Sequence, residues 1–276
     1  MLKTLQLARR DVRKRLLLIS VCLGLQIAAP TVVAQASQTL DAIVARNILR
    51  ACILPDYYGI TYRHPLNKML SGVDIDLSEA FARDLGVQLQ YIDTSLQTLV
   101  EDLQSDVCDI AMFALAQTRE RSQHLAFSVP YLQGDIYAVT HRGSTVISNW
   151  EDIDQPGVRV AVMAGSVFEL LMVDSLRHAE RVVIAPPLNQ ERELQSGRVD
   201  VFMTNLTYSR RLTAGSDWAR LMSPSSPVHN IPYAYAMRHG DPEWVARVDA
   251  FVTAAKADGR LTRAARKAGL EAMVAP

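Results

Sequence analysis

The sequence of 276 residues lacks the motifs of the common enzyme classes. It contains no G-x-S-x-G elbow, no phosphate-binding Walker loop and no dinucleotide-binding glycine pattern. Its six histidines are dispersed, and no two of them have the spacing of metal ligands on one element. Cys108 has no adjacent base and lies in an apolar run, which favours an inert thiol rather than an activated nucleophile. The sequence therefore predicts a non-enzymatic protein that needs no metal or organic cofactor.

The chain also lacks a surplus of charge of either sign, with 29 basic and 29 acidic side chains. Residues 1–36 carry six of the basic and one of the acidic side chains, so the rest has a formal charge of about −5. No basic run remains there, which argues against nucleic acid or an anionic membrane as partner. The remainder also has no long apolar run, and we expect it to be soluble.

Residues 1–36 have the order of a cleaved secretory signal. A basic start is followed by an uncharged apolar stretch over residues 16–29, and then by small residues up to Ala34-Gln35-Ala36. That ending matches an A-x-A cleavage site. A membrane anchor is the alternative, but the apolar stretch of about 14 residues is shorter than the roughly 20 that a spanning helix needs. We therefore expect export to the periplasm and cleavage near Ala36.

Cys52 and Cys108 are the two cysteines that remain after cleavage. An oxidising compartment permits a disulfide between them. Each, however, lies in an apolar run typical of a buried strand: Cys52 late in residues 49–54, Cys108 at the start of residues 108–113. If these strands are parallel neighbours, the two α-carbons are too far apart for a bridge. Two buried free thiols are therefore the preferred interpretation, and the bridge is the alternative.

Segments typical of strands and of helices alternate along the chain. The first group of strands and helices is predicted at residues 49–54, 73–86, 87–92, 96–103 and 108–113. In the helix over residues 73–86, Leu77, Phe81 and Leu85 recur at one-turn spacing, and Gly86 stands where a helix ends. A second group is predicted at residues 158–163, 165–173, 181–184, 188–196, 199–203 and 205–212. Continuous apolar strands separated by helices indicate two α/β units with parallel sheets.

Two extended segments, residues 135–140 and 233–237, join these units. They predict that the chain leaves one lobe, builds a second and returns, so that lobe 1 comprises residues 37–137 plus 233–276 and lobe 2 residues 138–232. A helix capped by Asp241 and a further helical segment at residues 256–268 complete the chain. Ligands of open α/β sheets bind at the carboxyl ends of the strands. Here those ends, which should face one cleft, are residues 54–57, 113–116, 163–167 and 203–205.

Several residues at these strand ends are candidates for binding. Arg121 lies in the first turn of a short predicted helix, where its guanidinium can bind a carboxylate through two parallel hydrogen bonds. The alternative is a surface arginine that pairs with Glu120 or with water. Tyr57 can cover a ligand or pack within its loop. Ser166 and Asn205 can contact a ligand or cap the helices that follow them.

An ordered set of short motifs runs through the chain. It comprises Leu49-Arg50, Val73-Asp74-Ile75-Asp76-Leu77, Asp109-Ile110, Thr118-x-x-Arg121, Phe127-Ser128-x-Pro130-Tyr131, Ser196-Gly197-Arg198-Val199-Asp200 and Gly240-Asp241-Pro242-Glu243. With these motifs the sequence resembles the type II periplasmic solute-binding proteins of polar amino acid ABC transporters, the family 3 extracellular solute-binding proteins. The resemblance implies a two-lobed α/β fold, each lobe a mainly parallel sheet flanked by helices, with two hinge crossings. It further implies hinge closure around a small solute for delivery to an inner-membrane permease, by a monomer.

The resemblance also implies roles for individual residues. Arg121 binds the α-carboxylate, helped by Ser166, and Tyr57 covers the side chain. An acidic residue usually holds the α-ammonium, but this chain has Asn205 there, and an amide lacks the charge that a buried ammonium favours. The ligand is then a carboxylate without an α-ammonium, or one whose amine is held by other groups. The predicted ligand-binding residues are Arg121, Tyr57, Leu96, Phe113, Ala114, Ser166, Val167 and Asn205.

A related branch of the same fold raises an enzymatic alternative. Asp56-Tyr57, the segment 108–112 and the segment 153–158 resemble periplasmic cyclohexadienyl (arogenate/prephenate) dehydratases. Those enzymes use a glutamate as general acid at the position of Tyr208, and a phenol with a pKa of about 10 is a poor acid at neutral pH. A third possibility is an accessory or sensor role for a periplasmic system. Solute binding for transport is the preferred prediction.

Overall fold

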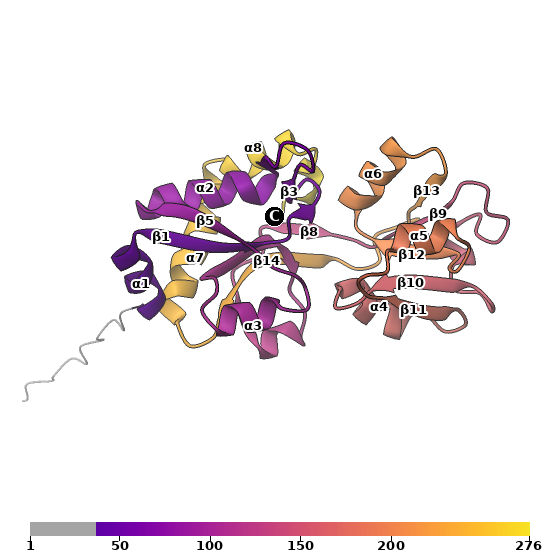
Figure 1. The fold of residues 1–276 in the computed structure, drawn as a ribbon, viewed down its shortest axis with the longest axis horizontal. Helices are drawn as coiled ribbons and strands as arrows, with labels where there is room; N and C mark the ends of the chain where they lie inside the picture. The colour runs from indigo at the N-terminus through magenta and orange to yellow at the C-terminus, as the bar shows by residue number, and fades with distance from the viewer. Residues whose placement is uncertain (1–36) are drawn as a thin grey trace, which may run out of the picture. The chain divides into compact units, whose positions relative to one another are not determined.

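Two main β-sheets organise residues 37–276, the part of the chain that the computed structural model describes (Figure 1). The predicted export signal, residues 1–36, lies outside the described residues. None of the helices in the described part is long and apolar enough to span a bilayer. The predicted alternation of strands and helices is present in both halves of this region.

The first sheet has a parallel centre. In spatial order its strands are β5 (Gln88–Asp93), β1 (Ile48–Ile53), β6 (Ile110–Ala116), β14 (Ile231–Arg238) and β7 (Leu125–Phe127), and β8 (Leu132–Gly134) also pairs with β14. Strands β5, β1 and β6 are parallel, whereas β14 is antiparallel to β6, β7 and β8. A small antiparallel sheet follows β1, made of β2 (Asp56–Tyr57), β3 (Thr61–Arg63) and β4 (Leu70–Ser71).

The second sheet repeats this plan. Its strands, in spatial order, are β11 (Glu180–Ile184), β10 (Arg159–Met163), β12 (Val201–Thr204), β9 (Tyr137–His141) and β13 (Ala219–Met222). The first three are parallel, and β9 is antiparallel to both of its neighbours. The two predicted crossing segments are β9 and β14, so each crossing is itself a strand inside a sheet. Both sheets are therefore mixed rather than mainly parallel, and the exact division into lobes stays a prediction.

Helices pack on both sheets. Those of the first group are α1 (Gln38–Arg46), α2 (Val73–Leu85), α3 (Leu99–Gln104), α7 (Pro242–Ala257) and α8 (Arg260–Lys267), and those of the second are α4 (Val167–Ser175), α5 (Gln190–Gln195) and α6 (Leu206–Gly215). Short 3₁₀ turns occur at Arg121–Gln123, Trp150–Asp152 and Glu271–Met273. The predicted ends are confirmed at Gly86, which closes α2 with a φ of 70°, and at Asp241, whose carboxylate accepts from the Trp244 N–H.

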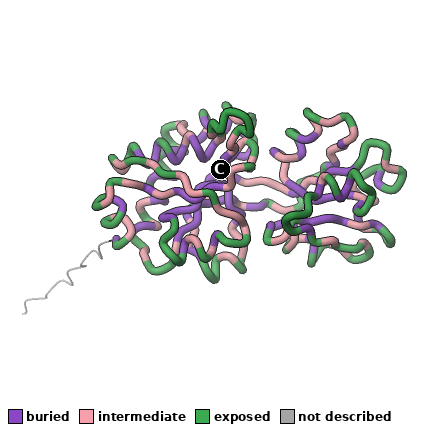
Figure 2. The backbone as a smooth tube through the Cα atoms, in the orientation of Figure 1, coloured by how far each residue is buried: buried purple, intermediate pink, exposed green. Residues whose placement is uncertain are grey.

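The central strands of the second sheet, β10 and β12, are buried on both faces. In β10, Val160 and Val162 belong to the large core cluster, whereas Ala161 between them belongs to a second cluster with Phe202 on the other face. A continuous apolar run is what a strand covered on both faces requires. Figure 2 shows the same division along the chain, with buried backbone in the strands and exposed backbone mainly in loops and on outer helix faces.

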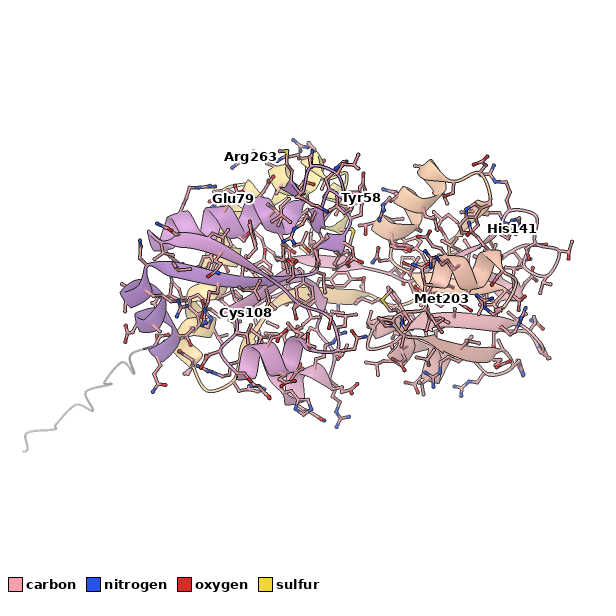
Figure 3. All side chains as sticks on the ribbon, viewed as in Figure 1. Tyr58, Glu79, Cys108, His141, Met203 and Arg263 are labelled. Carbon is pink, nitrogen blue, oxygen red and sulfur yellow. A yellow bond between two sulfur atoms is a disulfide. The ribbon has the colours of Figure 1, made fainter. Side chains whose placement is uncertain are left out.

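Cys52 and Cys108 form a disulfide, so the preferred prediction of two free thiols was wrong. The error lies in the assumed position of Cys108, which precedes β6 rather than beginning it. The chain bends there, the Asp109 N–H donates to the Arg50 carbonyl, and the α-carbon of Cys108 (labelled in Figure 3) comes within 5.7 Å of that of Cys52. The bridge closes a separation of 56 residues, which corresponds to a stabilisation of about 4 kcal/mol if it acts on the unfolded chain.

The helix predicted at residues 96–103 begins only at Leu99. The Thr98 N–H donates to the Ser95 hydroxyl, and the Ser95 N–H donates to the Thr98 hydroxyl. These reciprocal bonds hold a turn that delays the helix. Leu96 therefore lies in this turn and not on a helix face, and this position brings it to the cavity described next.

Candidate functional site

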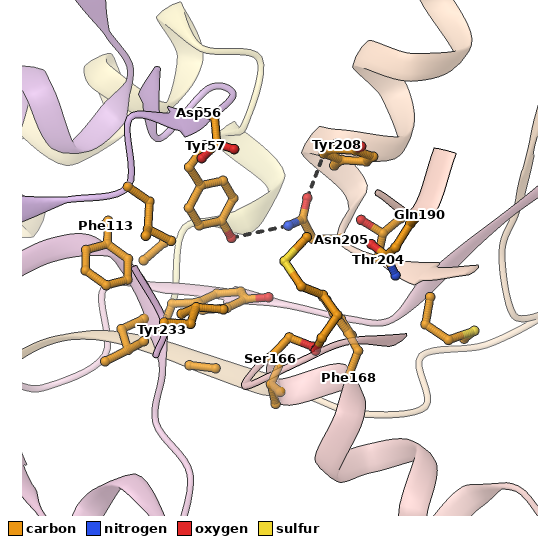
Figure 4. Close-up of a pocket in the computed structure, with 18 of the residues that line it drawn as sticks. Asp56, Tyr57, Phe113, Ser166, Phe168, Gln190, Thr204, Asn205, Tyr208 and Tyr233 are labelled. Atoms are coloured by element: carbon orange, nitrogen blue, oxygen red, sulfur yellow. Dashed lines mark hydrogen bonds between the residues drawn. The ribbon is translucent and has the colours of Figure 1, made fainter. Parts of the chain in front are cut away.

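The carboxyl ends of four strands, β1, β6, β10 and β12, meet at one cavity of about 150 Å³ (Figure 4). The predicted convergence of strand ends from both sheets is therefore confirmed. Its lining residues are Leu54, Asp56, Tyr57, Leu96, Phe113, Ala114, Leu115, Ala116, Arg121, Met163, Ser166, Val167, Phe168, Gln190, Met203, Thr204, Asn205, Tyr208 and Tyr233. All eight residues predicted to bind ligand are among them. That they bind one remains a prediction.

Arg121 is the cation among the lining residues. The Thr118 hydroxyl accepts from the Arg121 N–H and caps the short turn that Arg121 begins. The guanidinium donates from Nη1 to the Ala116 carbonyl and from Nη2 to the Gly165 carbonyl, each at 2.8 Å. No carboxylate of residues 37–276 forms a salt bridge with it. Burial lowers its pKa, but an arginine keeps its charge in a protein, so the cavity holds a cation without a salt bridge to any described residue.

Asn205 caps α6 and also faces the cavity. Its Oδ1 accepts from the Tyr208 N–H at 2.8 Å and from the Thr207 hydroxyl at 2.6 Å. Because both bonds require an oxygen, they fix the orientation of the amide, and Nδ2 donates towards the Tyr57 hydroxyl at 3.4 Å (Figure 4). The capping alternative is thus confirmed, and the group that Asn205 presents to the cavity is a donor.

Ser166 lines the cavity, yet its hydroxyl is already occupied. It caps α4 by accepting from the Glu169 N–H at 3.3 Å, and it donates to the Met163 carbonyl at 2.6 Å. The Gly165 N–H, which precedes Ser166 at the start of α4, donates to the Glu169 carboxylate at 2.7 Å. An incoming carboxylate would have to displace these bonds. Val167, the first residue of α4, contributes its apolar side chain.

Ala114 lies at an unusual point of β6, with a φ of 49° in the left-handed region. Its N–H donates to the Tyr131 hydroxyl at 2.9 Å, and Tyr131 in turn donates to the buried Asp74 carboxylate. Tyr235 donates to the other oxygen of Asp74 at 2.8 Å. Burial is the main cause that raises the pKa of Asp74 to about 7. This hydrogen-bonded group holds the kink that directs Phe113 and Ala114 to the cavity.

Five lining residues with polar groups were not among the predicted binding residues: Asp56, Gln190, Thr204, Tyr208 and Tyr233. Tyr233 belongs to β14, which the sequence showed only as a crossing segment, and burial raises its pKa. Gln190 is the first residue of α5, where a polar residue is ordinary and gives no sign of facing inward. The aromatic residue at position 233 was an available signal, but Tyr235 in the same strand gives the same signal and does not line the cavity. In the described region no group of three His, Cys, Asp or Glu side chains is placed to hold a metal ion.

Tyr208, which the resemblance to the dehydratases aligns with their acid, lines the cavity. Its hydroxyl donates to the Glu191 carboxylate at 2.5 Å. Burial, together with this acceptor, raises the pKa of Tyr208 well above its usual value. The phenol therefore holds its proton more tightly than a free tyrosine, which makes it a weaker acid still.

Comparison with known proteins agrees with this geometry. Residues 49–271 match the profile of the bacterial extracellular solute-binding proteins, family 3. The chain is 28% identical over 241 residues to a cyclohexadienyl dehydratase of Pseudomonas aeruginosa, covering 87% of this chain and 88% of that protein. It is 22% identical over 200 residues to a putative ABC transporter arginine-binding protein 2 of Escherichia coli, covering 70% and 79%.

Among solved structures, an ancestral amino acid-binding protein described as a precursor of cyclohexadienyl dehydratase superposes with a TM-score of 0.72. The two are 28% identical, and the match covers 83% of this chain and 98% of the other. The fold is thus the predicted periplasmic-binding-protein type II fold. Since the profile covers nearly all of the described region, the chain belongs to the bacterial extracellular solute-binding proteins of family 3.

Proposed function

We propose that the chain is a periplasmic solute-binding protein that captures a small carboxylate, an amino acid or a related organic acid, for an ABC transporter. The observation that carries this proposal is the Arg121 guanidinium, which lies in a mainly apolar cavity without an ion-pair partner among the described residues. A buried charge is costly unless it is paired, so such a cation favours an anionic ligand. A cavity of about 150 Å³ is large enough for a ring the size of benzene, which limits the ligand to a small molecule.

Closure of the two sheets around the ligand is part of this proposal. Three hydrogen bonds connect them across the cavity: Arg121 to the Gly165 carbonyl, Gln97 to the Ala164 carbonyl at 3.0 Å, and Asn205 to the Tyr57 hydroxyl. Each uses a flexible side chain on at least one side, so each can break without unfolding either sheet. Closure would exclude water and strengthen the interaction of Arg121 with a carboxylate.

The periplasmic location and the transporter partner rest on two supports. Residues 1–36 have the pattern of an export signal, and the family consists of bacterial extracellular solute-binding proteins. The disulfide between Cys52 and Cys108 fits an oxidising compartment. The arginine-binding relative named above carries an ABC transporter in its description. We infer a monomer that delivers its solute to an inner-membrane permease.

The proposal is tested by a thermal-shift screen of amino acids, their 2-oxo and 2-hydroxy analogues, and aromatic acids. Arg121→Ala should still fold but bind the best carboxylate about a hundredfold more weakly or worse, because the ligand charge then has no partner. Arg119→Ala removes an exposed arginine two residues away, outside the cavity lining, and should leave the shift unchanged. An equal shift in the wild type and Arg121→Ala would refute Arg121 as the anchor.

A second candidate is the dehydratase reaction of the Pseudomonas relative, since that protein matches over most of both chains. Against it stands Tyr208, whose phenol is bound to Glu191 and has a raised pKa. Incubation with prephenate and with arogenate, followed by absorbance of the aromatic product, separates the two functions. Product formed by the wild type but not by Arg121→Ala would establish the enzyme, whereas binding without turnover supports solute capture.

A further inference from the structure

Gln190 has a buried side-chain amide that the rest of the protein does not satisfy. The residue is 5% exposed and lines the cavity, and its Nε2 has no hydrogen-bond partner among the described residues. Figure 4 places it beside Thr204 and Asn205, on the side of the cavity opposite Phe113. A buried amide donor without a partner costs roughly 1–3 kcal/mol, so an unpaired one calls for an explanation.

Two acceptors near Gln190 already serve other donors. The Oδ1 of Asn205 already accepts from the Tyr208 N–H and from the Thr207 hydroxyl. The Glu191 carboxylate accepts from the Tyr208 hydroxyl. An oxygen atom of a ligand in the cavity can supply the acceptor that Gln190 Nε2 lacks in the described structure.

Two side chains besides Gln190 offer N–H donors to the cavity. Arg121 offers the N–H groups that its two carbonyl contacts leave over, and Asn205 presents its Nδ2. The carboxylate among the lining residues is Asp56, whose side chain is exposed to solvent. The lining residues thus offer donors at Arg121 and Asn205 but no buried carboxylate. This combination favours a ligand rich in oxygen acceptors over a ligand with a buried ammonium.

We propose that Gln190 is a second polar anchor of the cavity, and that the ligand carries a carbonyl or carboxylate oxygen for it in addition to the carboxylate at Arg121. This inference rests on the proposed function and narrows its ligand class to dicarboxylates and oxo-acids. Gln190 then determines specificity, because a ligand without the second acceptor leaves the buried amide unpaired. Leaving a buried amide unpaired costs more binding free energy than losing an ordinary apolar contact.

Matched pairs of probes test the anchor by isothermal titration calorimetry. Glutarate and pentanoate, adipate and hexanoate, and 4-oxopentanoate and pentanoate differ mainly in the second acceptor. The wild type should bind the acceptor-bearing member about tenfold more tightly in at least one pair. Gln190→Met keeps the length of the side chain but removes its hydrogen bonds, and it should abolish that preference. Gln195→Met, at an exposed position of the same helix, should retain it.

The unliganded melting temperature gives an independent readout. If the amide is unpaired without ligand, Gln190→Met should melt at the same temperature as the wild type or higher, because no internal bond is lost. A lower melting temperature together with an unchanged preference would show a structural role and overturn the inference. If the wild type bound carboxylates but bound both members of every pair equally, the inference about Gln190 would be overturned and the proposed function would stand. If the wild type bound none of the probes, nor any acid of the thermal-shift screen, the proposed function would fail as well.

Discussion

Position 205 carries an amide where the family resemblance implies an acid for an ammonium, and the hydrogen bonds of Asn205 indicate what a single exchange would change. Asn205 Oδ1 is committed to the cap of α6, so only Nδ2 faces the cavity. Asn205→Asp keeps a capping oxygen, since aspartate caps as well as asparagine, and places a second, charged oxygen beside Tyr57. We expect the preference for α-amino acids over their deaminated analogues to rise about tenfold, measured by calorimetry on matched ligand pairs.

Asn205→Ala is the control for that exchange. It removes the cap and should lower the free energy of unfolding by about 1 kcal/mol without creating any preference for an amine. Asn205→Asp should leave the unfolding free energy nearly unchanged, since it keeps the cap. If Asn205→Asp and the wild type discriminate identically between amines and their deaminated analogues, residue 205 does not face the ammonium position.

At the scale of elements, Asp74 links the start of α2 to β14 and to the kink of β6 through Tyr235 and Tyr131. Burial raises its pKa from an ordinary value of 3.8 to about 7. A carboxyl with a raised folded pKa binds its proton more tightly in the folded state. Its contribution to stability is therefore fully present below the unfolded pKa and is lost as the pH rises through about 7.

Urea unfolding of the wild type and Asp74→Asn at pH 5 and pH 8 measures this loss. As the pH rises from 5 towards the folded pKa, the free energy of unfolding of the wild type should fall by about 1.4 kcal/mol per pH unit relative to Asp74→Asn. The variant lacks this loss because its amide does not titrate. Other titrating groups are common to both proteins and cancel in the difference. Parallel pH profiles would mean that Asp74 keeps the same charge state when the chain unfolds.

Helices and strands were predicted correctly where burial imposes a regular spacing of apolar residues. The prediction failed where a few local hydrogen bonds or a bend set where an element begins. Leu77 and Phe81 fix α2 through their spacing, and Gly86 fixes its end. The turn that displaces Leu96 depends on hydroxyl pairs, and the disulfide of Cys108 depends on a bend before β6, which no apolar pattern records. Gln190 reaches the cavity only through the packing of α5 on the second sheet, a tertiary effect that its own neighbours in sequence do not encode.

For the whole molecule, the proposed closure needs contacts that form outside the cavity. Arg211 on α6 lies over the rings of Tyr58 and Tyr62, with 5.6 and 5.3 Å from its guanidinium carbon to the ring centroids. Both tyrosines belong to the segment around β2 and β3, and Tyr58 is labelled in Figure 3. None of the three lines the main cavity. A cation held against two aromatic faces would stabilise the proposed closed arrangement from outside the cavity.

Removing that contact should therefore weaken binding through the closing equilibrium. Arg211→Ala is expected to raise Kd about threefold to tenfold, mostly through faster dissociation, since a smaller fraction of the liganded protein is closed. Stopped-flow measurement of the on- and off-rates separates these contributions. Arg210→Ala removes the same charge from the adjacent, equally exposed position of α6 and should leave both rates unchanged. Equal rates in all three proteins would mean that Arg211 has the same surroundings before and after the ligand binds, and hence that closure occurs without this contact.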